Sequence, residues 1–228
     1  VFATGRVYDQ IRNSICYPNL NVKIGATHAG ITVGEDGATH QMLEDINLMR
    51  GLPNMTVISP ADDAESRWAV NEAAKIEGPV YIRFGRASTP AIYDENTKFE
   101  FGKAIMHGDG EDATVFATGI MVAEALKAQI ALKEEGINIR VVDFHTIKPI
   151  DEEMIVKCAK ETKKLISIEE HSVIGGLGSA ISEVLCEKYP AKLVRMGMKD
   201  CFGKSGPAGE LLKYYGLTEK EIAEEVRK

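Results

Sequence analysis

The residues with the clearest potential for chemistry lie in one glycine-rich stretch, Thr27–Gln41, which reads THAGITVGEDGATHQ. An apolar run, 21–26, precedes it, and apolar residues at helical spacing, 41–50, follow it. Loops held by a rigid scaffold often carry functional side chains, and α/β sheets bind ligands at the carboxyl ends of their strands. The stretch is therefore predicted to be a ligand-handling loop. Its polar and flexible residues are His28, Gly30, Gly34, Glu35, Asp36, Gly37 and His40.

His40 is the first candidate for proton transfer. The pattern places it at the N-terminus of the predicted 41–50 helix, with Thr39 as the N-cap, where the helix dipole disfavours an imidazolium. Because the unperturbed pKa of histidine is about 6.5, a neutral ring there could accept or relay a proton near neutral pH. A histidine that only caps its helix is the alternative. The neighbouring His28 and the Gly-Glu-Asp-Gly turn favour the functional interpretation.

Asp36 and two arginines are candidates for substrate binding. Asp36 lies between glycines that would let the backbone approach a ligand, and its carboxylate could fix a substrate hydroxyl. Ordinary Asp-Gly turn chemistry explains it equally well. Arg83 and Arg86 lie at the carboxyl end of the apolar strand 79–84, so they are predicted to face the same crevice as His28, where a guanidinium suits phosphate. A surface salt bridge is an equal alternative for both.

The elements that would position these side chains alternate between short apolar strands and amphipathic helices. The order predicts two parallel or mostly parallel three-layer α/β domains, 1–95 and 96–228, joined by the aperiodic stretch 89–98. In the third helix expected in the first domain, a capping-box-like start places Ser59 as the N-cap residue and Pro60 at the first helical position. In the helix 121–135, we expect Val122, Leu126 and Ile130 to face inward. The expected strands are 21–26, 55–58, 79–84, 113–117, 137–142, 165–168 and 192–196, and the other expected helices are 8–16, 41–50, 151–161, 179–188 and two at the C-terminal end.

Composition excludes several classes of protein. The net charge of −7 argues against a nucleic-acid-binding surface, and no apolar run approaches the roughly 18 residues that span a bilayer. The chain shows no signal-peptide pattern, so we expect a cytoplasmic protein. The cysteines at 16, 158, 186 and 201 lack metal-site spacing, so reduced thiols and no metal site within the chain are expected.

Three familiar motifs fail on their spacing or context. The segment 202–205 (FGKS) lacks the four-residue gap between glycines that a phosphate-binding P-loop needs. The segment 170–178 follows a strand, but its glycines have the wrong spacing for dinucleotide binding, and close packing of strand and helix explains them better. The segment 108–110 (GDG), with Asn138 downstream, is similar to the metal–diphosphate motif of thiamine enzymes. It joins two strand-like runs, which favours a plain turn.

The stretch 27–41 resembles the transketolase family, specifically the pyrimidine-binding domain. The resemblance extends over essentially the whole chain, and the THAG…GEDGATHQ core is its most specific part. The chain looks most like the C-terminal subunit of a transketolase divided between two chains. Supporting segments are NVKIGATHAG, LPNMTVISPAD, GPVYIRFGR, DATVFATGIMVAEAL and FGKSGPAGELLKYYG.

The resemblance implies a thiamine-diphosphate enzyme that transfers a two-carbon ketol unit between sugar phosphates. His40 matches the family histidine that binds the donor's hydroxyls and assists proton transfer, and Asp36 matches an acid that recognises hydroxyl stereochemistry. His28 and Arg86 match positions that hold the substrate phosphate, and Phe2 matches, more weakly, an aromatic wall around the aminopyrimidine ring. The implied partners are an N-terminal transketolase subunit or domain, which would hold most of the diphosphate and Mg²⁺ site, and further copies in a homodimer or heterotetramer.

The resemblance also implies what the chain would need from elsewhere. The family glutamate that activates the aminopyrimidine lies upstream of the segment matched by Val1. We therefore expect the 228 residues to be a truncated piece, inactive alone, whose first sheet lacks one or more strands. Three alternatives stay open: 1-deoxy-D-xylulose-5-phosphate synthase, which shares the GxDGxTHQ core, a 2-oxoacid dehydrogenase E1 β-like subunit, and a non-catalytic dimerisation or regulatory module.

Overall fold

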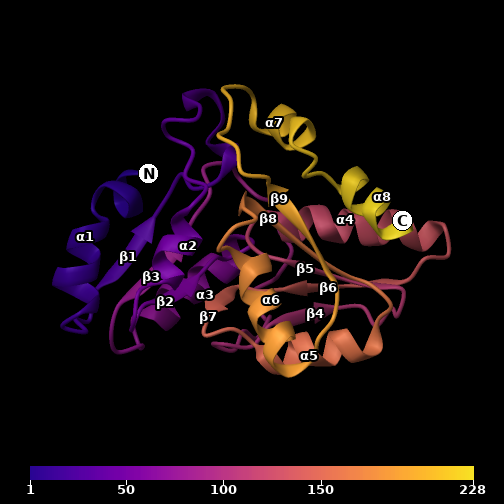
Figure 1. Cartoon of the computed structure of the whole chain (residues 1–228), viewed down its shortest axis with the longest axis horizontal. Coiled ribbons are helices and arrows are strands. Elements are labelled where there is room, and N and C mark those ends of the chain that lie inside the picture. The colour runs from indigo at the N-terminus through magenta and orange to yellow at the C-terminus, as the bar shows by residue number, and fades with distance from the viewer.

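The computed structural model describes all 228 residues and contains two mostly parallel sheets side by side (Figure 1). The first has the order β1-β3-β2-β7 and the second β4-β6-β5-β8-β9, and only β7 and β4 pair antiparallel to their neighbours. The predicted mostly parallel α/β class is confirmed. The strands are β1 (Lys23–Ala26), β2 (Thr56–Ile58), β3 (Val80–Arg83), β4 (Ile105–His107), β5 (Ala113–Ala117), β6 (Ile139–Asp143), β7 (Thr146–Lys148), β8 (Leu165–Ser172) and β9 (Leu193–Met198).

Helices cover both faces of the second sheet. Helices α4 (Met121–Glu134) and α8 (Glu219–Arg227) pack on one face, and α5 (Glu152–Glu161) and α6 (Leu177–Lys188) pack on the other. Side chains alternate along each strand, so Val115 of β5 belongs to the first of these cores and Phe116 to the second. The central strand β5 is buried throughout, as a strand covered on both faces must be.

The first sheet is also covered on both faces. One face packs against α2 (Asp45–Arg50) and an N-terminal helical segment made of η1 (Phe2–Arg6), α1 (Tyr8–Gln10) and η2 (Ile11–Cys16). The other face packs against α3 (Asp63–Ala73). Two further elements lie near the tip of the molecule in Figure 1: the 3-10 segment η3 (Ile31–Asp36) and helix α7 (Ala208–Tyr214).

Strand β7 links the two halves of the chain. It comes directly after β6 of the second sheet in the chain. It nevertheless pairs with β2 of the first sheet, with Ile58 opposite Thr146. Neither β7 nor β4 is among the expected strands, because both pair antiparallel and stand outside the strand–helix alternation on which the prediction rests. The irregular segment between β3 and β4 contains no helix or strand, as expected for 89–98. A domain division near residue 95 stays a prediction.

Several local predictions were wrong. Asp62, rather than Ser59, caps α3 by accepting a hydrogen bond from the Glu65 N–H, so Pro60 lies before the helix instead of at its first position. Ile130 of α4 is 65% exposed rather than inward-facing, whereas Val122 is buried as expected.

The GDG segment forms the turn between β4 and β5, as predicted. All four cysteines are free thiols. No helix has the length and apolar character needed to cross a membrane.

Candidate functional site

The loop predicted to handle the ligand begins at the carboxyl end of β1. Its two ends are tied together, because Gly30 N–H donates to the Met42 carbonyl over 2.8 Å. Its start is also tied to the end of β3, because Ala29 N–H donates to the Phe84 carbonyl over 3.1 Å. Between these anchors the chain turns through η3, with positive φ at Gly34 (84°) and Gly37 (74°). Residues with a Cβ rarely adopt such angles, so the glycines make this compact path possible.

His28 shares this unusual backbone. Its φ of 65° lies in the left-handed region, which is uncommon for a residue other than glycine and is frequent at binding sites. Its Nδ1 lies 2.9 Å from Thr27 Oγ1, and the side chain is exposed. The loop therefore presents the imidazole to solvent at the mouth of the site.

His40 lies in a turn rather than at a helix N-terminus. Helix α2 begins only at Asp45 with Glu44 as its N-cap residue, so neither the Thr39 cap nor the helix-dipole argument for His40 holds. The His40 N–H donates to the Gly37 carbonyl over 2.9 Å, and its Nδ1 lies 3.0 Å from Thr39 Oγ1. The physical reason is that Gly37 bends the chain back on itself, which postpones the helix by one turn.

One cavity brings four of the six residues predicted for the site together. It has a volume of about 420 Å³, and Phe2, His28, Asp36 and His40 all line it. The Phe2 ring packs edge-on against the His40 imidazole, with 5.2 Å between centroids, and is itself 45% exposed. The cavity thus combines polar groups at its mouth with an apolar wall that includes Val1, Ala3, Val33, Met42 and Tyr81.

The two arginines behave differently from each other. Arg86 is exposed and lies beside the loop, where its Nη1 donates to the Val33 carbonyl over 2.5 Å and to Glu35 Oε2 over 3.1 Å. It does not line the cavity itself. Arg83 does not face the crevice, contrary to prediction. It is buried, and its Nε donates to Asp45 Oδ2 over 2.8 Å.

Arg83 belongs to a buried polar network that the sequence analysis did not find. Its Nη2 donates to the Glu170 carbonyl over 3.1 Å, and its Nη1 lies 3.8 Å from the Glu170 carboxylate. The hydroxyl of Tyr81, which also lines the cavity, donates to Asp45 Oδ2 over 2.6 Å. On the far side, His171 Nε2 lies 3.9 Å from Asp45 Oδ1. The sequence held one signal for this network: the ionisable residues 169–171 directly continue an apolar strand.

Burial and pairing compete in setting the charges of this network. Burial alone would raise the pKa of Asp45, but Arg83, His171 and the Tyr81 hydroxyl together hold it below its usual value. Burial opposes the charge on Arg83, yet Asp45 and Glu170 raise its pKa. Burial raises the pKa of Glu170 despite the opposing pull of Arg83. The strongest pair is therefore Arg83 with Asp45.

The glycine-rich segment after β8 does not form a dinucleotide site. The Glu169 carboxylate accepts hydrogen bonds from Leu177 N–H (2.7 Å) and Gly178 N–H (2.9 Å) at the start of α6. A carboxylate therefore fills the position that a dinucleotide phosphate would occupy. The 202–205 segment is likewise irregular and is not joined directly to a strand. Both motifs rejected from the sequence are accounted for structurally.

The cavity fits part of a thiamine cofactor. A planar ring can pack against Phe2 and the apolar wall, and aromatic and aliphatic surfaces of this kind favour such contacts. The chain has no group of three or more His, Cys, Asp or Glu side chains arranged to hold a metal ion. The residues present thus fit the ring of the cofactor but not a metal-bound diphosphate.

Comparisons with known proteins identify the family of the chain. Two family models match: the transketolase pyrimidine-binding domain over residues 1–91 and the transketolase C-terminal domain over residues 102–222. The chain belongs to the transketolase family. A relative from Methanocaldococcus jannaschii, described as a transketolase C-terminal section, is 52% identical across 99% of this chain and 72% of its own length. A 6-deoxy-6-sulfo-D-fructose transketolase subunit from a Clostridium species is 46% identical across 97% of this chain and 69% of its own length.

Solved structures support the same assignment. A structure described as a split gene transketolase, an inactive β4 tetramer, superimposes with a TM-score of 0.92 at 52% identity, across 99% of this chain and 72% of that one. A transketolase mutant from Pichia stipitis superimposes with a TM-score of 0.78 at 26% identity, across 99% of this chain and 32% of that one. The chain therefore corresponds to about a third of a long transketolase chain and to most of a divided one.

Proposed function

We propose that this chain supplies the substrate-binding side of a thiamine-diphosphate-dependent transketolase that moves a two-carbon ketol unit between sugar phosphates. The observation that carries the proposal is the cavity in which Phe2, His28, Asp36 and His40 converge. An interaction module has no need of two exposed imidazoles and a carboxylate gathered around an apolar wall. Family membership and the relatives described as transketolase subunits support it.

The residues divide the work between the reacting end and the phosphate end of the sugar. His40 binds the donor's hydroxyls and moves a proton at its ring nitrogen, while Asp36 accepts a hydrogen bond from a sugar hydroxyl. His28 and Arg86 bind the substrate phosphate, for which Arg86 must exchange its contact with Glu35. That surface ion pair is weak, so the exchange costs little. Phe2 packs against the aminopyrimidine ring.

Thiamine diphosphate supplies the nucleophilic carbon when it is bound, and we propose that an N-terminal transketolase subunit or domain holds its diphosphate together with Mg²⁺. The 228 residues alone would then be inactive. The related split transketolase described as an inactive β4 tetramer supports this expectation. Tetrameric or dimeric assembly with that partner is part of the same proposal.

The test combines the natural full-length chain with its thiamine-diphosphate-binding partner, thiamine diphosphate and Mg²⁺. Ketol transfer is assayed with ketose phosphate donors and aldose phosphate acceptors, and the donor panel includes 6-deoxy-6-sulfofructose and apulose 4-phosphate, because two relatives are named for them. Transfer that requires all components supports the proposal. Condensation of pyruvate instead would favour a deoxyxylulose-phosphate synthase, represented among the relatives at 37% identity. No reaction with any donor would favour a non-catalytic module.

Two substitutions separate the proposed roles. His40→Ala should reduce kcat about 100-fold, because general acid–base groups contribute roughly that much. Arg86→Leu should raise KM for phosphorylated substrates while leaving kcat nearly unchanged. If both variants show the same changes in kcat and in KM, the division into a reacting end and a phosphate end is wrong.

A further inference from the structure

The C-terminal half of the chain reaches directly into the substrate-binding loop. Glu170, in β8 of the second sheet, accepts two hydrogen bonds from Thr32 in η3: one from the backbone N–H over 3.1 Å and one from the hydroxyl over 2.8 Å. Both residues are buried. Thr32 lies midway between His28 and Asp36, so this contact holds the loop at its centre.

The loop is shaped to admit this carboxylate. A Cβ at Gly30 would overlap the carboxyl group of Glu170, so only a glycine fits there, and its φ of 87° also requires one. The carboxylate is fixed from its other side by Arg83, which Asp45 holds in turn. Glu170 is therefore held both by Arg83 and by the loop.

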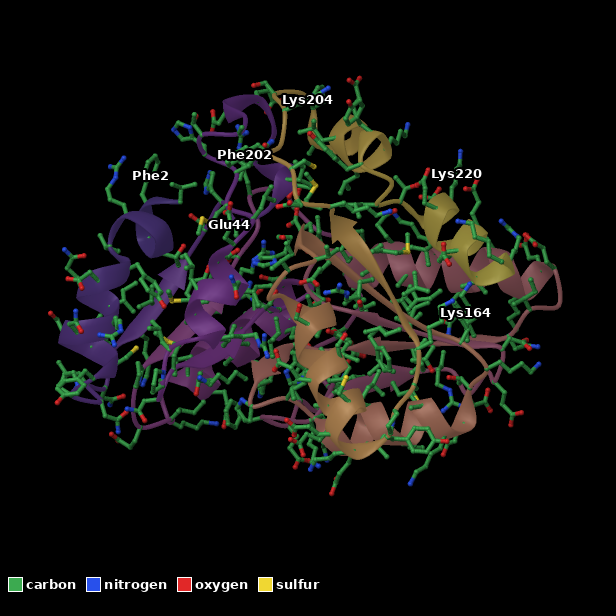
Figure 2. All side chains as sticks on the ribbon, viewed as in Figure 1. Phe2, Glu44, Lys164, Phe202, Lys204 and Lys220 are labelled. Atoms are coloured by element: carbon green, nitrogen blue, oxygen red, sulfur yellow. The ribbon has the colours of Figure 1, made fainter.

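A second contact comes from the segment that leads into α7. Gln41 Nε2 donates to the Lys204 carbonyl over 2.8 Å and to the loop carbonyls of Ile31 and Gly34 over 3.2 and 3.3 Å. Figure 2 shows Phe202 and Lys204 on the irregular segment between β9 and α7, which passes beside the loop. Gly37 approaches Ser205 so closely that a Cβ there would overlap its hydroxyl. The loop thus rests on the C-terminal half at two points.

We propose that Glu170 is a positioning residue for the substrate-binding loop, by which the C-terminal half sets the placement of His28 and His40. Glu170 does not line the cavity. It acts through Thr32. The inference deepens the proposed function and rests on it for its kinetic consequence, whereas the structural consequence for the two imidazoles is independent of any activity.

Thr32→Val tests this proposal with little change in shape. The substitution removes the hydroxyl donor to Glu170 but keeps the backbone N–H donor, and Thr32→Ser restores the hydroxyl. Thr118→Val is the matched control, because Thr118 is also buried and its hydroxyl donates to the Phe144 carbonyl over 2.9 Å. Each valine variant loses one buried hydroxyl, so an effect that arises only from reduced stability should appear in both.

The first readout is the imidazole NMR signals of the five histidines of residues 1–228, recorded on the protein as it occurs naturally. Thr32→Val should shift or broaden the signals of His28 and His40 and leave His107 unchanged, while Thr32→Ser and Thr118→Val leave His28 and His40 as they are. Unchanged His28 and His40 signals in Thr32→Val would refute the positioning role, whether or not the protein transfers ketol units.

The second readout is steady-state kinetics of the chain with its partner subunit. Thr32→Val should lower kcat/KM about tenfold or more, because misplacement of binding groups by less than 1 Å is costly. KM should move more than kcat, since the loop carries substrate-binding groups. Thr32→Ser and Thr118→Val should stay within about twofold of the unmodified protein. Equal losses in Thr32→Val and Thr118→Val would overturn the proposal, whereas ketol transfer absent from the unmodified complex would overturn only the proposed function.

Discussion

A buried carboxyl pair should make the stability of this chain fall as the pH rises toward neutrality. Glu65 of α3 and Asp143 of β6 are fully buried and lie within hydrogen-bonding reach of each other. The Ala61 N–H donates to Glu65 Oε2 over 2.6 Å, and the Tyr93 hydroxyl donates to Asp143 Oδ2 over 2.7 Å. The remaining oxygens, Glu65 Oε1 and Asp143 Oδ1, have no N–H or O–H donor. Only a proton shared between the two groups satisfies them.

The surroundings of the pair favour retention of this proton. Burial and the nearby Asp62 carboxylate raise the pKa of both acids, to about 7 for Asp143. No cation faces them: His107, whose Nε2 lies 2.9 Å from the Tyr93 hydroxyl, has its pKa lowered by burial. Burial likewise lowers the pKa of the neighbouring His145, to about 4.

The sign and size of the effect follow from linkage. Because the folded-state pKa lies above the unfolded value, the native state binds more protons between about pH 4 and pH 7, so stability falls as the pH rises through that window. One extra proton is worth about 1.4 kcal/mol per pH unit, so raising the pH from 5 to 7 should cost roughly 3 kcal/mol. Glu65→Gln replaces the acid with an amide that donates the same hydrogen bond at every pH. It should remove most of this slope.

The assay is urea unfolding at pH 5, 6, 7 and 8. It is monitored by the fluorescence of the single tryptophan, Trp68, which packs 4.6 Å from the His145 ring. Glu134→Gln on the exposed face of α4 is the matched control, and it should keep the slope of the unmodified chain. Parallel curves for Glu65→Gln and the unmodified chain over this range would refute the shared proton.

Three further outcomes are expected. Gly30→Ala should destabilise the fold by roughly 2–4 kcal/mol through backbone strain and overlap with Glu170. Gly136 has a similar φ of 79° but open space around it, so Gly136→Ala should cost only about 1 kcal/mol. Urea unfolding of both variants measures the difference. His40→Ala should change the free energy of unfolding by less than about 0.5 kcal/mol, because the side chain is exposed, so any loss of ketol transfer would be chemical. Asp45→Asn should cost roughly 3–5 kcal/mol, because a buried guanidinium loses its charged partner, and calorimetry at pH 7 checks this. Since the Asp45 pKa is lowered on folding, its contribution is present above about pH 4 and is lost below it.

Prediction from the sequence worked where local pattern and chemistry coincide. Strand β5 was predicted with its observed bounds, because an apolar run bounded by turns has few other structures available to it. The strand–loop order around 27–41 followed from the glycines and polar residues alone. His28, Asp36 and His40 then share a cavity because that loop closes on itself. Its closure places residues twelve positions apart in the chain on one wall.

The errors arose where a tertiary partner decided the structure. Arg83 and Arg86 are alike in the sequence, and nothing local indicates that Asp45 would draw only Arg83 into the interior. His40 was predicted to lie at a helix N-terminus because the apolar residues at helical spacing follow it. The Gln41 side chain instead binds carbonyls of the loop and of the 203–206 segment. Strand β7 stands outside the strand–helix alternation, and it exists because β2 offers an unpaired edge.

Three contacts that the sequence does not predict join the two halves of the chain. Strand β7 pairs with β2, Asp143 meets Glu65, and Glu170 meets Thr32 and Arg83, so each contact joins one half to the other. Two of the three place ionisable groups out of water, where the loss of either partner leaves a costly unpaired group. Relative motion of the halves would break all three together. The loop 27–41 is therefore held by Glu170 of the second sheet as well as by the sheet from which it emerges.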